Sequence, residues 1–363
     1  MLRCNMKRLT SSIILCSFLL FCACESAVED HGGNTDGTLL VNLDVSVALS
    51  DIADALTRAD DTGAANDNEK MHKLRVVIVR PNWTVEANEL IDLEAAALEY
   101  QALKRFPVVG DEKKLIYLFV NEDTEAEAAD GSGITRKLVD FPLGNIQVGS
   151  PFPANAIESL KISLTNNTER IKGPLPMSEK HLFPVSKEPE QQCRLFVTRA
   201  AVKFTFRINN QSTRDITLKG LTIDKMAREE WYMPRATYEV NQGTGQREIT
   251  AYEVPAGTGY YTYDRKEVAE TVQVASKREQ TLDPVYLLEG KYTDDTDERN
   301  YSMELSVYNG TDKLTRRHYF PNLKSLPRNT HVVVNITYKD ADVTCTVDVI
   351  PYSDVPLEPG FGL

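Results

Sequence analysis

The pattern of apolar and polar positions is sharpest near the start of the chain. Residues 38–49 alternate strictly, which is typical of a β-strand with one buried face. One face carries Leu39, Val41, Leu43, Val45, Val47 and Leu49, and the other carries Leu40, Asn42, Asp44, Ser46 and Ala48. The pattern therefore predicts a well-defined first strand that contributes six apolar side chains to a core.

Many shorter strands follow this first one. The strongest are residues 73–80 and 114–121, and others are expected at 194–209, 216–223, 271–275, 284–288, 301–308, 315–320, 331–339 and 343–350. Residues 94–104 are rich in Ala, Leu and Glu, which predicts a short helix. Numerous short strands with few helical patterns indicate an all-β fold made of antiparallel β-sandwich domains.

A polar linker separates the first strand from the rest. Residues 60–69 are small, polar and acidic, which predicts a flexible segment open to proteases, and Arg58 and Ala59 stand at its start. Arg75 and Arg80 follow, but they lie in or beside a strand expected to be buried, so Arg58 is the better cleavage site. The alternatives are a solvated Arg58 and a first strand that is a permanent edge strand.

The chain begins with an export signal. Residues 1–23 combine a basic start with an apolar run at 13–21, which is too short to span a bilayer as a helix. Cys24 follows Ala23, an arrangement that resembles the cleavage box of bacterial lipoproteins, although Phe21 and Cys22 depart from its commonest form. We therefore expect acyl chains on Cys24 that attach the precursor to a membrane. An ordinary secretory signal is the alternative.

The end of the chain carries a second alternating strand. Its apolar face holds Val343, Cys345, Val347 and Val349, and its polar face holds Thr344, Thr346 and Asp348. Residues 351–363 contain three prolines, which cannot donate to a β-ladder, so this tail should lie along an edge or reach outside its domain. A tail of this kind could add a strand to another copy, and head-to-tail contacts that do not close give filaments.

Composition narrows the classes of function. With 363 residues and 42% hydrophobic content the chain is large enough for about two domains, and a net charge of −12 argues against nucleic acid as a partner. Five scattered histidines and the lack of hydrolase, phosphate-loop or zinc motifs predict no enzyme activity, no cofactor and no metal site. The acidic stretch 294–298 is expected to be a solvated loop. Beyond the signal only Cys193 and Cys345 remain, either bridged or separately buried.

The chain resembles the Bacteroidales-type fimbrillins, or type V pilins, over nearly its whole length. The resemblance is carried by the signal, the first strand, Arg58 and the segments 73–79, 175–177 (Leu-Pro-Met), 199–204 (Arg-Ala-Ala-Val-Lys-Phe) and 361–363 (Phe-Gly-Leu). It implies two transthyretin-like antiparallel β-sandwich domains with Greek-key-like connections. It also implies that an arginine-specific protease cuts between Arg58 and Ala59, and that residues 343–363 act as a donor strand.

The resemblance gives a full layout. We expect a signal peptide (1–23), a propeptide with the removable strand (24–58), an N-terminal domain (59–233) and a C-terminal domain (234–363). The predicted function is that of a structural pilin, an outer-membrane lipoprotein as precursor, which joins other fimbrial subunits in a surface fimbrium. One alternative is a lipid-anchored anchor or accessory subunit. Another is a glycan-binding surface lipoprotein that uses Trp83, Trp231 and the tyrosines at 260–263.

Overall fold

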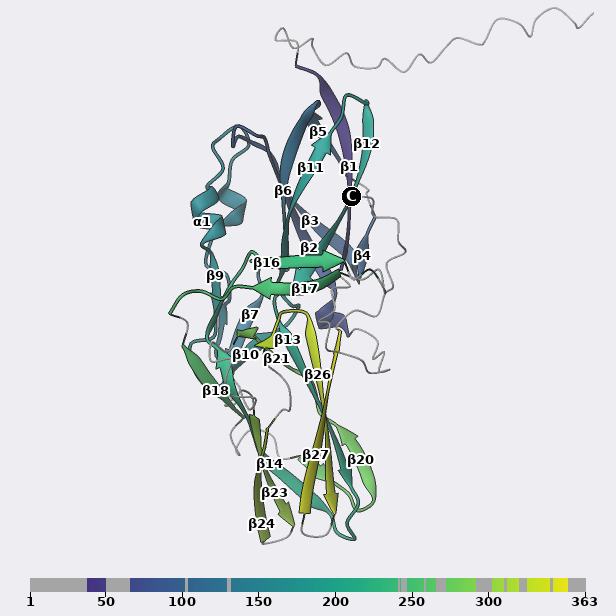
Figure 1. Ribbon diagram of the computed structural model, residues 1–363, viewed down its shortest axis with the longest axis vertical. Coiled ribbons are helices and arrows are strands. Elements are labelled where there is room, and N and C mark those ends of the chain that lie inside the picture. Colours follow the sequence, from purple (N-terminus) through teal and green to yellow (C-terminus); the bar gives the residue numbers. More distant parts are fainter. Residues whose placement is uncertain are drawn as a thin grey trace, which may run out of the picture. The chain divides into compact units, whose positions relative to one another are not determined.

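The structure is a computed structural model, shown in Figure 1. It describes residues 38–49, 66–101, 104–128, 132–240, 242, 247–257, 259–265, 272–291, 302–309, 312–319, 325–339 and 342–351. The chain divides into two compact units, Met1–Thr38 and Leu39–Leu363, and almost everything described belongs to the second. The predictions for Cys24, Arg58, Ala59 and residues 294–298 and 352–363 concern positions outside the described residues.

The first group of strands forms one large sheet. Its order is β3-β2-β6-β11-β12-β1-β4, with β5 also paired to β1. The bounds are β1 Leu40–Leu49, β2 Met71–Val79, β3 Val85–Ala97, β4 Glu99–Tyr100, β5 Arg105–Val109, β6 Glu112–Val120, β11 Met177–Val185 and β12 Glu190–Arg199. The strongly apolar strands β2 and β6 pair with each other inside this sheet, and most of their residues are buried.

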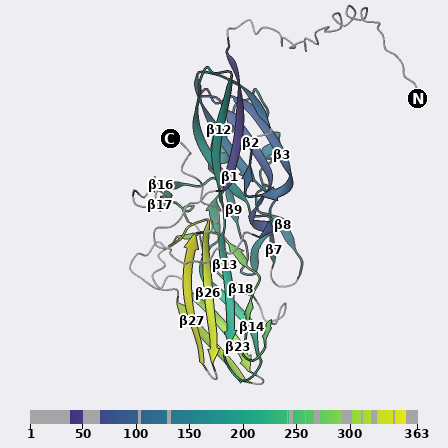
Figure 2. The same ribbon diagram turned by 90° about the vertical axis from the view of Figure 1, so that its right-hand side faces the viewer.

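The second group forms two further sheets, of order β20-β13-β26-β27 with β21 beside β13, and β18-β14-β23-β24 with β19 beside β14. Figure 2 shows β26 and β27 running side by side. The bounds are β13 Val202–Asn210, β14 Ile216–Ala227, β18 Tyr260–Arg265, β19 Val272–Val274, β20 Arg278–Thr281, β21 Val285–Leu287, β23 Ser302–Asn309, β24 Asp312–Tyr319, β26 Thr330–Lys339 and β27 Asp342–Pro351.

Smaller elements complete the fold. Three short strands form a sheet of order β10-β7-β8, and the pairs β9–β15, β16–β17 and β22–β25 are two-stranded. The bounds are β7 Glu125–Ala128, β8 Thr135–Lys137, β9 Lys161–Ser163, β10 Glu169–Lys172, β15 Glu229–Trp231, β16 Ala236–Val240, β17 Arg247–Tyr252, β22 Gly290–Lys291, β25 Ser325–Leu326, α1 Ala154–Glu158, η1 Asp67–Glu69 and η2 Leu143–Asn145.

The all-β fold predicted from the sequence is confirmed. Most strand pairs are antiparallel, but β1 runs parallel to β12 and β13 runs parallel to β26. β12 and β13 follow each other along the chain, joined by Ala200 and Ala201. β1 is the parallel partner of β12, and β26 is the parallel partner of β13, so β1 and β26 occupy comparable places in the two groups.

One expectation is wrong, and a second stays a prediction. The predicted short helix at 94–104 is absent, because residues 85–97 continue as the long edge strand β3, which pairs with β2. Pairing with a neighbouring strand has overridden the local helix preference there. Strand pairing changes from one sheet to the next at residues 200–201, whereas the sequence predicted a boundary at Met233–Pro234. Since Leu39–Leu363 form one compact unit, that boundary stays a prediction.

In the described part of the chain, no helix is long and apolar enough to cross a membrane.

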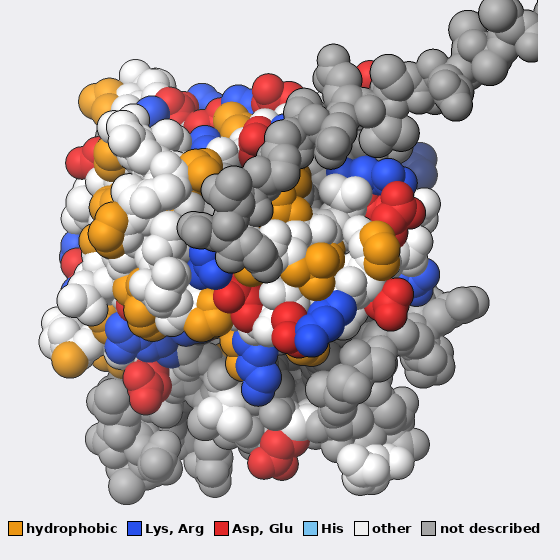
Figure 3. All heavy atoms as spheres, turned by 90° about the horizontal axis from the view of Figure 1, so that it is seen from above, with side chains coloured by type: hydrophobic (Ala, Val, Ile, Leu, Met, Phe, Trp, Pro, Cys, Tyr) orange, Lys and Arg blue, Asp and Glu red, His pale blue; other side chains and the backbone are white. Residues whose placement is uncertain are grey.

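Figure 3 looks at the end of the structure that is uppermost in Figure 1. Acidic and basic side chains alternate there with small apolar patches.

Candidate functional site

The first strand lies inside its sheet and not at an edge. On one side β1 pairs with β12 in parallel over eight positions, from Asn42 to Leu49. On the other side it pairs antiparallel with β5 and then with β4. The strand ends are also bonded, since the amide of Asn42 donates to the Pro189 carbonyl at 2.8 Å and that of Leu49 to the Leu98 carbonyl at 3.0 Å. Both backbone edges of β1 therefore have partners.

Burial along β1 follows the alternation in the sequence. Val41, Leu43, Val45, Val47 and Leu49 are all buried, and three of them are completely shielded from solvent. The intervening polar side chains are half-buried. Leu39 is the exception in the predicted apolar set, because it precedes the strand and its side chain is 44% exposed. We call the space between β12 and β5, in which β1 lies, the groove. The groove receives five of the six predicted apolar side chains.

Gly110 shows how closely the neighbouring turn approaches β1. A Cβ atom at this position would lie 2.9 Å from the Val41 Cγ1 atom and 2.9 Å from the Ser186 carbonyl oxygen. The amide of Gly110 also donates to the Leu39 carbonyl at 2.8 Å. Only glycine leaves room for the turn to close over the start of the strand.

The walls of the groove are apolar. Cys193, Leu195 and Val197 of β12 and Phe106 and Val108 of β5 are buried on either side of β1. Cys193 is a free thiol, and burial raises its pKa to about 12. Since the thiolate is the reactive form, this cysteine acts as a small apolar side chain at neutral pH.

An ion-pair chain crosses the solvent face of β1. Arg105 of β5 lies 3.4 Å (Nε to Oδ1) from Asp44 of β1 and 3.0 Å (NH1 to Oε1) from Glu190 of β12. Arg105 therefore reaches from one wall of the groove to the other through the first strand. The Arg105 and Glu190 side chains are more than half exposed, so we expect this chain of charges to contribute little to stability.

The wall formed by β4 and β5, opposite β12, depends on β1 for its backbone pairing. Within the described residues, β4 and β5 have β1 as their only ladder partner. Side chains of β3 also hold this part of the chain: the Val109 amide donates to Glu86 Oε1 at 2.5 Å, and Lys104, just before β5, pairs with Glu89 at 2.7 Å. Loss of β1 would separate β12 from β5 and expose two unpaired backbone edges.

The predicted donor strand has a place in its own sheet. β27 pairs antiparallel with β26 over ten positions, from Asp342 opposite Lys339 to Pro351 opposite Thr330, and it is the last strand of that sheet. Val343 is buried while Thr344 and Thr346 are exposed, as the alternation predicts. The side chains of Cys345, Val347 and Val349 are outside the described set. Among the described strands, β27 therefore has one neighbour on its own sheet, whereas β1 has partners on both edges.

The aromatic residues considered for glycan binding fall into different environments. Tyr261 and Tyr263 are buried, and Trp231 is covered by Arg235, whose guanidinium carbon lies 3.7 Å from the ring centroid. Trp83 is 46% exposed in a turn with a φ of 67°. These residues do not form one aromatic platform.

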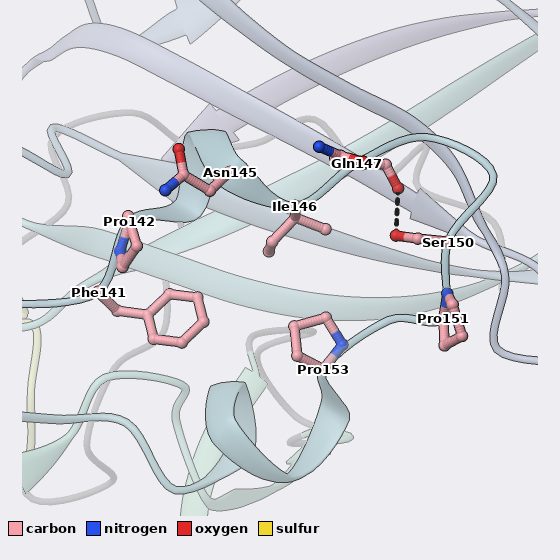
Figure 4. Close-up of a pocket in the computed structure, with 8 residues that line it drawn as sticks. All are labelled: Phe141, Pro142, Asn145, Ile146, Gln147, Ser150, Pro151 and Pro153. Carbon is pink, nitrogen blue, oxygen red and sulfur yellow. Dashed lines mark hydrogen bonds between the residues drawn. The ribbon is translucent and has the colours of Figure 1, made fainter.

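The described residues contain little that suggests catalysis. No group of three or more His, Cys, Asp or Glu side chains in the described ranges is placed to hold a metal ion. A shallow cavity of about 300 Å³, shown in Figure 4, is lined by Phe141, Pro142, Asn145, Ile146, Gln147, Ser150, Pro151 and Pro153. None of these side chains is an acid or a base, and the Ser150 hydroxyl donates to the Gln147 carbonyl at 2.6 Å. The lining lacks the acid–base groups that an active site needs.

Comparison with solved structures gives the fold a context. The chain is similar to a "putative cell adhesion protein" of Parabacteroides distasonis, at 13% identity and a TM-score of 0.52 over 88% of this chain and 99% of that one. It is also similar to the tip fimbrial protein Mfa3 of Porphyromonas gingivalis (11% identity, 86% and 99% covered, TM-score 0.48). A fimbrilin of the same organism aligns at 14% identity (87% and 99% covered, TM-score 0.44).

Structural neighbours of this chain are thus fimbrial and cell adhesion proteins of Bacteroidales, and the resemblance predicted from the sequence is confirmed as a likeness of fold. No protein-family model and no curated protein matches the chain.

Proposed function

We propose that this chain is a structural subunit of a surface fimbrium that polymerises by exchanging its first strand for a strand of another copy. The observation that carries the proposal is the position of β1, which is paired along both edges and buries five apolar side chains. A strand in this position cannot leave without a replacement, because it exposes two ladders and an apolar groove. The intact strand then acts as a plug against premature assembly.

β27 of a second copy is the replacement that we propose. β1 and β27 are both ten residues long and both alternate between apolar and polar positions. Residues 343–363 would act as the donor: β27 would leave its own sheet, where it has one neighbour among the described strands, and enter a groove that offers two. Strand addition of this kind combines ladder hydrogen bonds with pockets for alternate side chains. Each added copy presents its own tail, so the contact does not close and a filament grows.

The precursor steps follow from the sequence. Lipid on Cys24 would hold the chain at the outer membrane until an arginine-specific protease hydrolyses the bond between Arg58 and Ala59. The released product would lose both the lipid and β1. Its partners would be further copies together with tip and anchor subunits, and we propose transthyretin-like topology for both sandwiches. The chain itself would catalyse no reaction.

The test is the N-terminus of protein sheared from the cell surface. We expect it to begin at Ala59, and we expect Arg58→Ala to leave a lipid-bound monomer with less than a tenth of the wild-type polymer. Arg58→Lys is the matched control: it keeps the positive charge, yet an arginine-specific protease should spare it. Abundant polymer from Arg58→Ala would contradict the proposal. An acylated start at Cys24 in the assembled protein would instead support the anchor-subunit alternative.

A second test distinguishes the donor tail from the groove that accepts it. Deletion of residues 343–363 should stop the addition of further subunits while the groove still accepts a tail from an intact copy. The measurement is the capping of growing polymer by the truncated chain. Free elongation past the truncated subunit would show that its tail is not the donor.

A further inference from the structure

The last residue of the predicted linker (60–69) departs from the expected flexible segment, because Glu69 docks in a buried polar site. Glu69, at the end of η1, is 1% exposed and is the fourth residue of the described range that begins at residue 66. Its carboxylate lies 2.7 Å from Lys203 Nζ of β13 and accepts a hydrogen bond of 2.7 Å from the Tyr286 hydroxyl of β21. A buried carboxylate needs such partners, and here a charged donor and a neutral donor provide them.

The backbone of the same segment is also held. Arg199 Nε donates to the Glu69 carbonyl at 2.9 Å, and Arg199 NH1 donates to Asn329 Oδ1 at 3.2 Å. The Asn66 side-chain amide donates to the Tyr286 hydroxyl at 2.7 Å. We call Glu69, Arg199, Lys203 and Tyr286 the Glu69 clamp. It joins the start of the processed chain to β12, β13 and β21.

The clamp gives a physical reason for the sequence 199–203, Arg-Ala-Ala-Val-Lys. Arg199 is the last residue of β12 and Lys203 is the second residue of β13, so the two cations flank the connection between the sheets. Ala200 and Ala201 between them are fully buried, where a larger side chain would have no space. Both cations meet one residue, Glu69, which is 130 positions from Arg199 in the sequence.

The next residues are held in turn by Asn121. Its side-chain carbonyl accepts from the amides of His72 and Lys73 at 2.9 and 3.2 Å, and its side-chain amide donates to the carbonyls of Lys70 and Leu175 at 3.0 and 2.8 Å. The chain is therefore fixed without a break from the clamp into β2. Cleavable residues in this stretch, Lys70, Lys73 and Arg75, can reach a protease only if the segment opens.

We infer that the Glu69 clamp is a docking site that retains residues 69–73 when β1 is cut away, and that it sets the inner limit of proteolysis. The inference builds on the proposed cut at Arg58, but its test does not need polymerisation. Cleavage of a transiently opened segment follows the population of the open form. Weakening the clamp should raise that population and move the cut inward, which would remove β2 residues from the centre of the first sheet.

The experiment is a time course of trypsin digestion on the purified full chain, with N-terminal sequencing and mass analysis of the products. Wild-type protein should be cut after Arg58 and keep Lys70 and Lys73 intact. Glu69→Ala should give new N-termini at Met71 and Leu74 at least tenfold faster than wild type. Glu89→Ala is the matched control, because it also removes a carboxylate from a 2.7 Å lysine pair, but an exposed one, and should keep the wild-type pattern.

A milder variant protects the test against a general loss of folding. Tyr286→Phe removes one hydroxyl and should raise the rates after Lys70 and Lys73 severalfold, with Lys114 and other buried sites still uncut. Wild-type rates at Lys70 and Lys73 in both Glu69→Ala and Tyr286→Phe would overturn the inference. If trypsin does not cut the wild type after Arg58, the proposed processing is in doubt, while the rates at Lys70 and Lys73 still report on the clamp.

Discussion

The two ends of this chain form strands of equal length in unlike positions. β1 lies between β12 and the β4–β5 wall, whereas β27 has β26 alone as its neighbour among the described strands. A central strand is held by two ladders and by side chains packed on both walls, and an edge strand gives up one ladder when it leaves. The difference suggests why removal of the first strand would need a protease, while the last strand could be released by competition.

The largest expected effect comes from deleting one strand or the other. Five buried Leu or Val side chains contribute roughly 7–15 kcal/mol, an amount similar to the roughly 5–15 kcal/mol by which a whole domain is stable. Deletion of residues 39–49 should therefore expose the amides of β12 and β5 to hydrogen exchange, and a synthetic peptide of that sequence should restore protection. Deletion of residues 342–351 should leave the amides of β12 protected. Equal exchange in the two deletions would remove the distinction between the strands.

A single side chain in β1 sharpens the comparison. Leu43 is completely buried, so Leu43→Ala should lower the free energy of unfolding of the uncleaved chain by about 2–5 kcal/mol. Leu39→Ala is the matched control on the same predicted face. Because Leu39 is 44% exposed, its effect should stay within about 0.5 kcal/mol. Denaturant titration measures both, and similar losses would mean that Leu39 also packs in the groove.

Acid should weaken the sheet that holds β27. His331 in β26 is buried, and burial together with Lys203 and Arg207 lowers its pKa to about 3. In the unfolded chain this histidine takes up a proton below a pKa of about 6.5, whereas in the folded protein it stays neutral until about pH 3. The folded state therefore keeps its full stability above pH 6.5 and loses stability as the pH falls toward 3. Between pH 7 and pH 5 the loss should be on the order of 2 kcal/mol.

The control for this effect is His331→Gln, which cannot take up the proton but can still pair with Thr205, whose hydroxyl lies 2.9 Å from His331 Nε2. Hydrogen exchange in β26 and β27, corrected for intrinsic rates, should depend less on pH in the variant. An unchanged pH dependence would assign the acid effect to other groups.

The smallest effect concerns the charges that cross β1. Arg105→Ala removes the contacts with Asp44 and Glu190, and we expect a loss of about 0.2–1 kcal/mol that disappears at high salt. Lys104→Ala, which breaks the exposed pair with Glu89 next to it, should give a similar figure. A much larger loss for Arg105→Ala would indicate that the ion pairs fasten β1 in the groove.

Sequence reasoning succeeded where the signal was local. The alternation at 38–49 predicted which side chains are buried, with two exceptions: Leu39 is exposed, and Ala48, on the predicted polar face, is buried. It failed at residues 94–104, where Ala, Leu and Glu favour a helix but residues 94–97 lie in β3, which pairs with β2, and residues 99–100 form β4, which pairs with β1. The Glu69 clamp was also missed. The basic residues in 199–203 are recognisable in the sequence, but nothing near them indicates that Glu69 is their acidic partner.

By itself, then, the sequence determined an all-β protein, the inward face of its first strand and the candidate cleavage and donor segments. These follow from the two-residue period of a strand and from local composition. Only the tertiary structure decided that β1 lies beside β12, so that Asn42 pairs with Glu190, about 150 positions later in the chain. It also decided that β27 is the last described strand of its sheet, and that Glu69 contacts Lys203 and Tyr286. Contacts between distant segments depend on how all the sheets pack together, and that packing leaves no periodic trace in either segment.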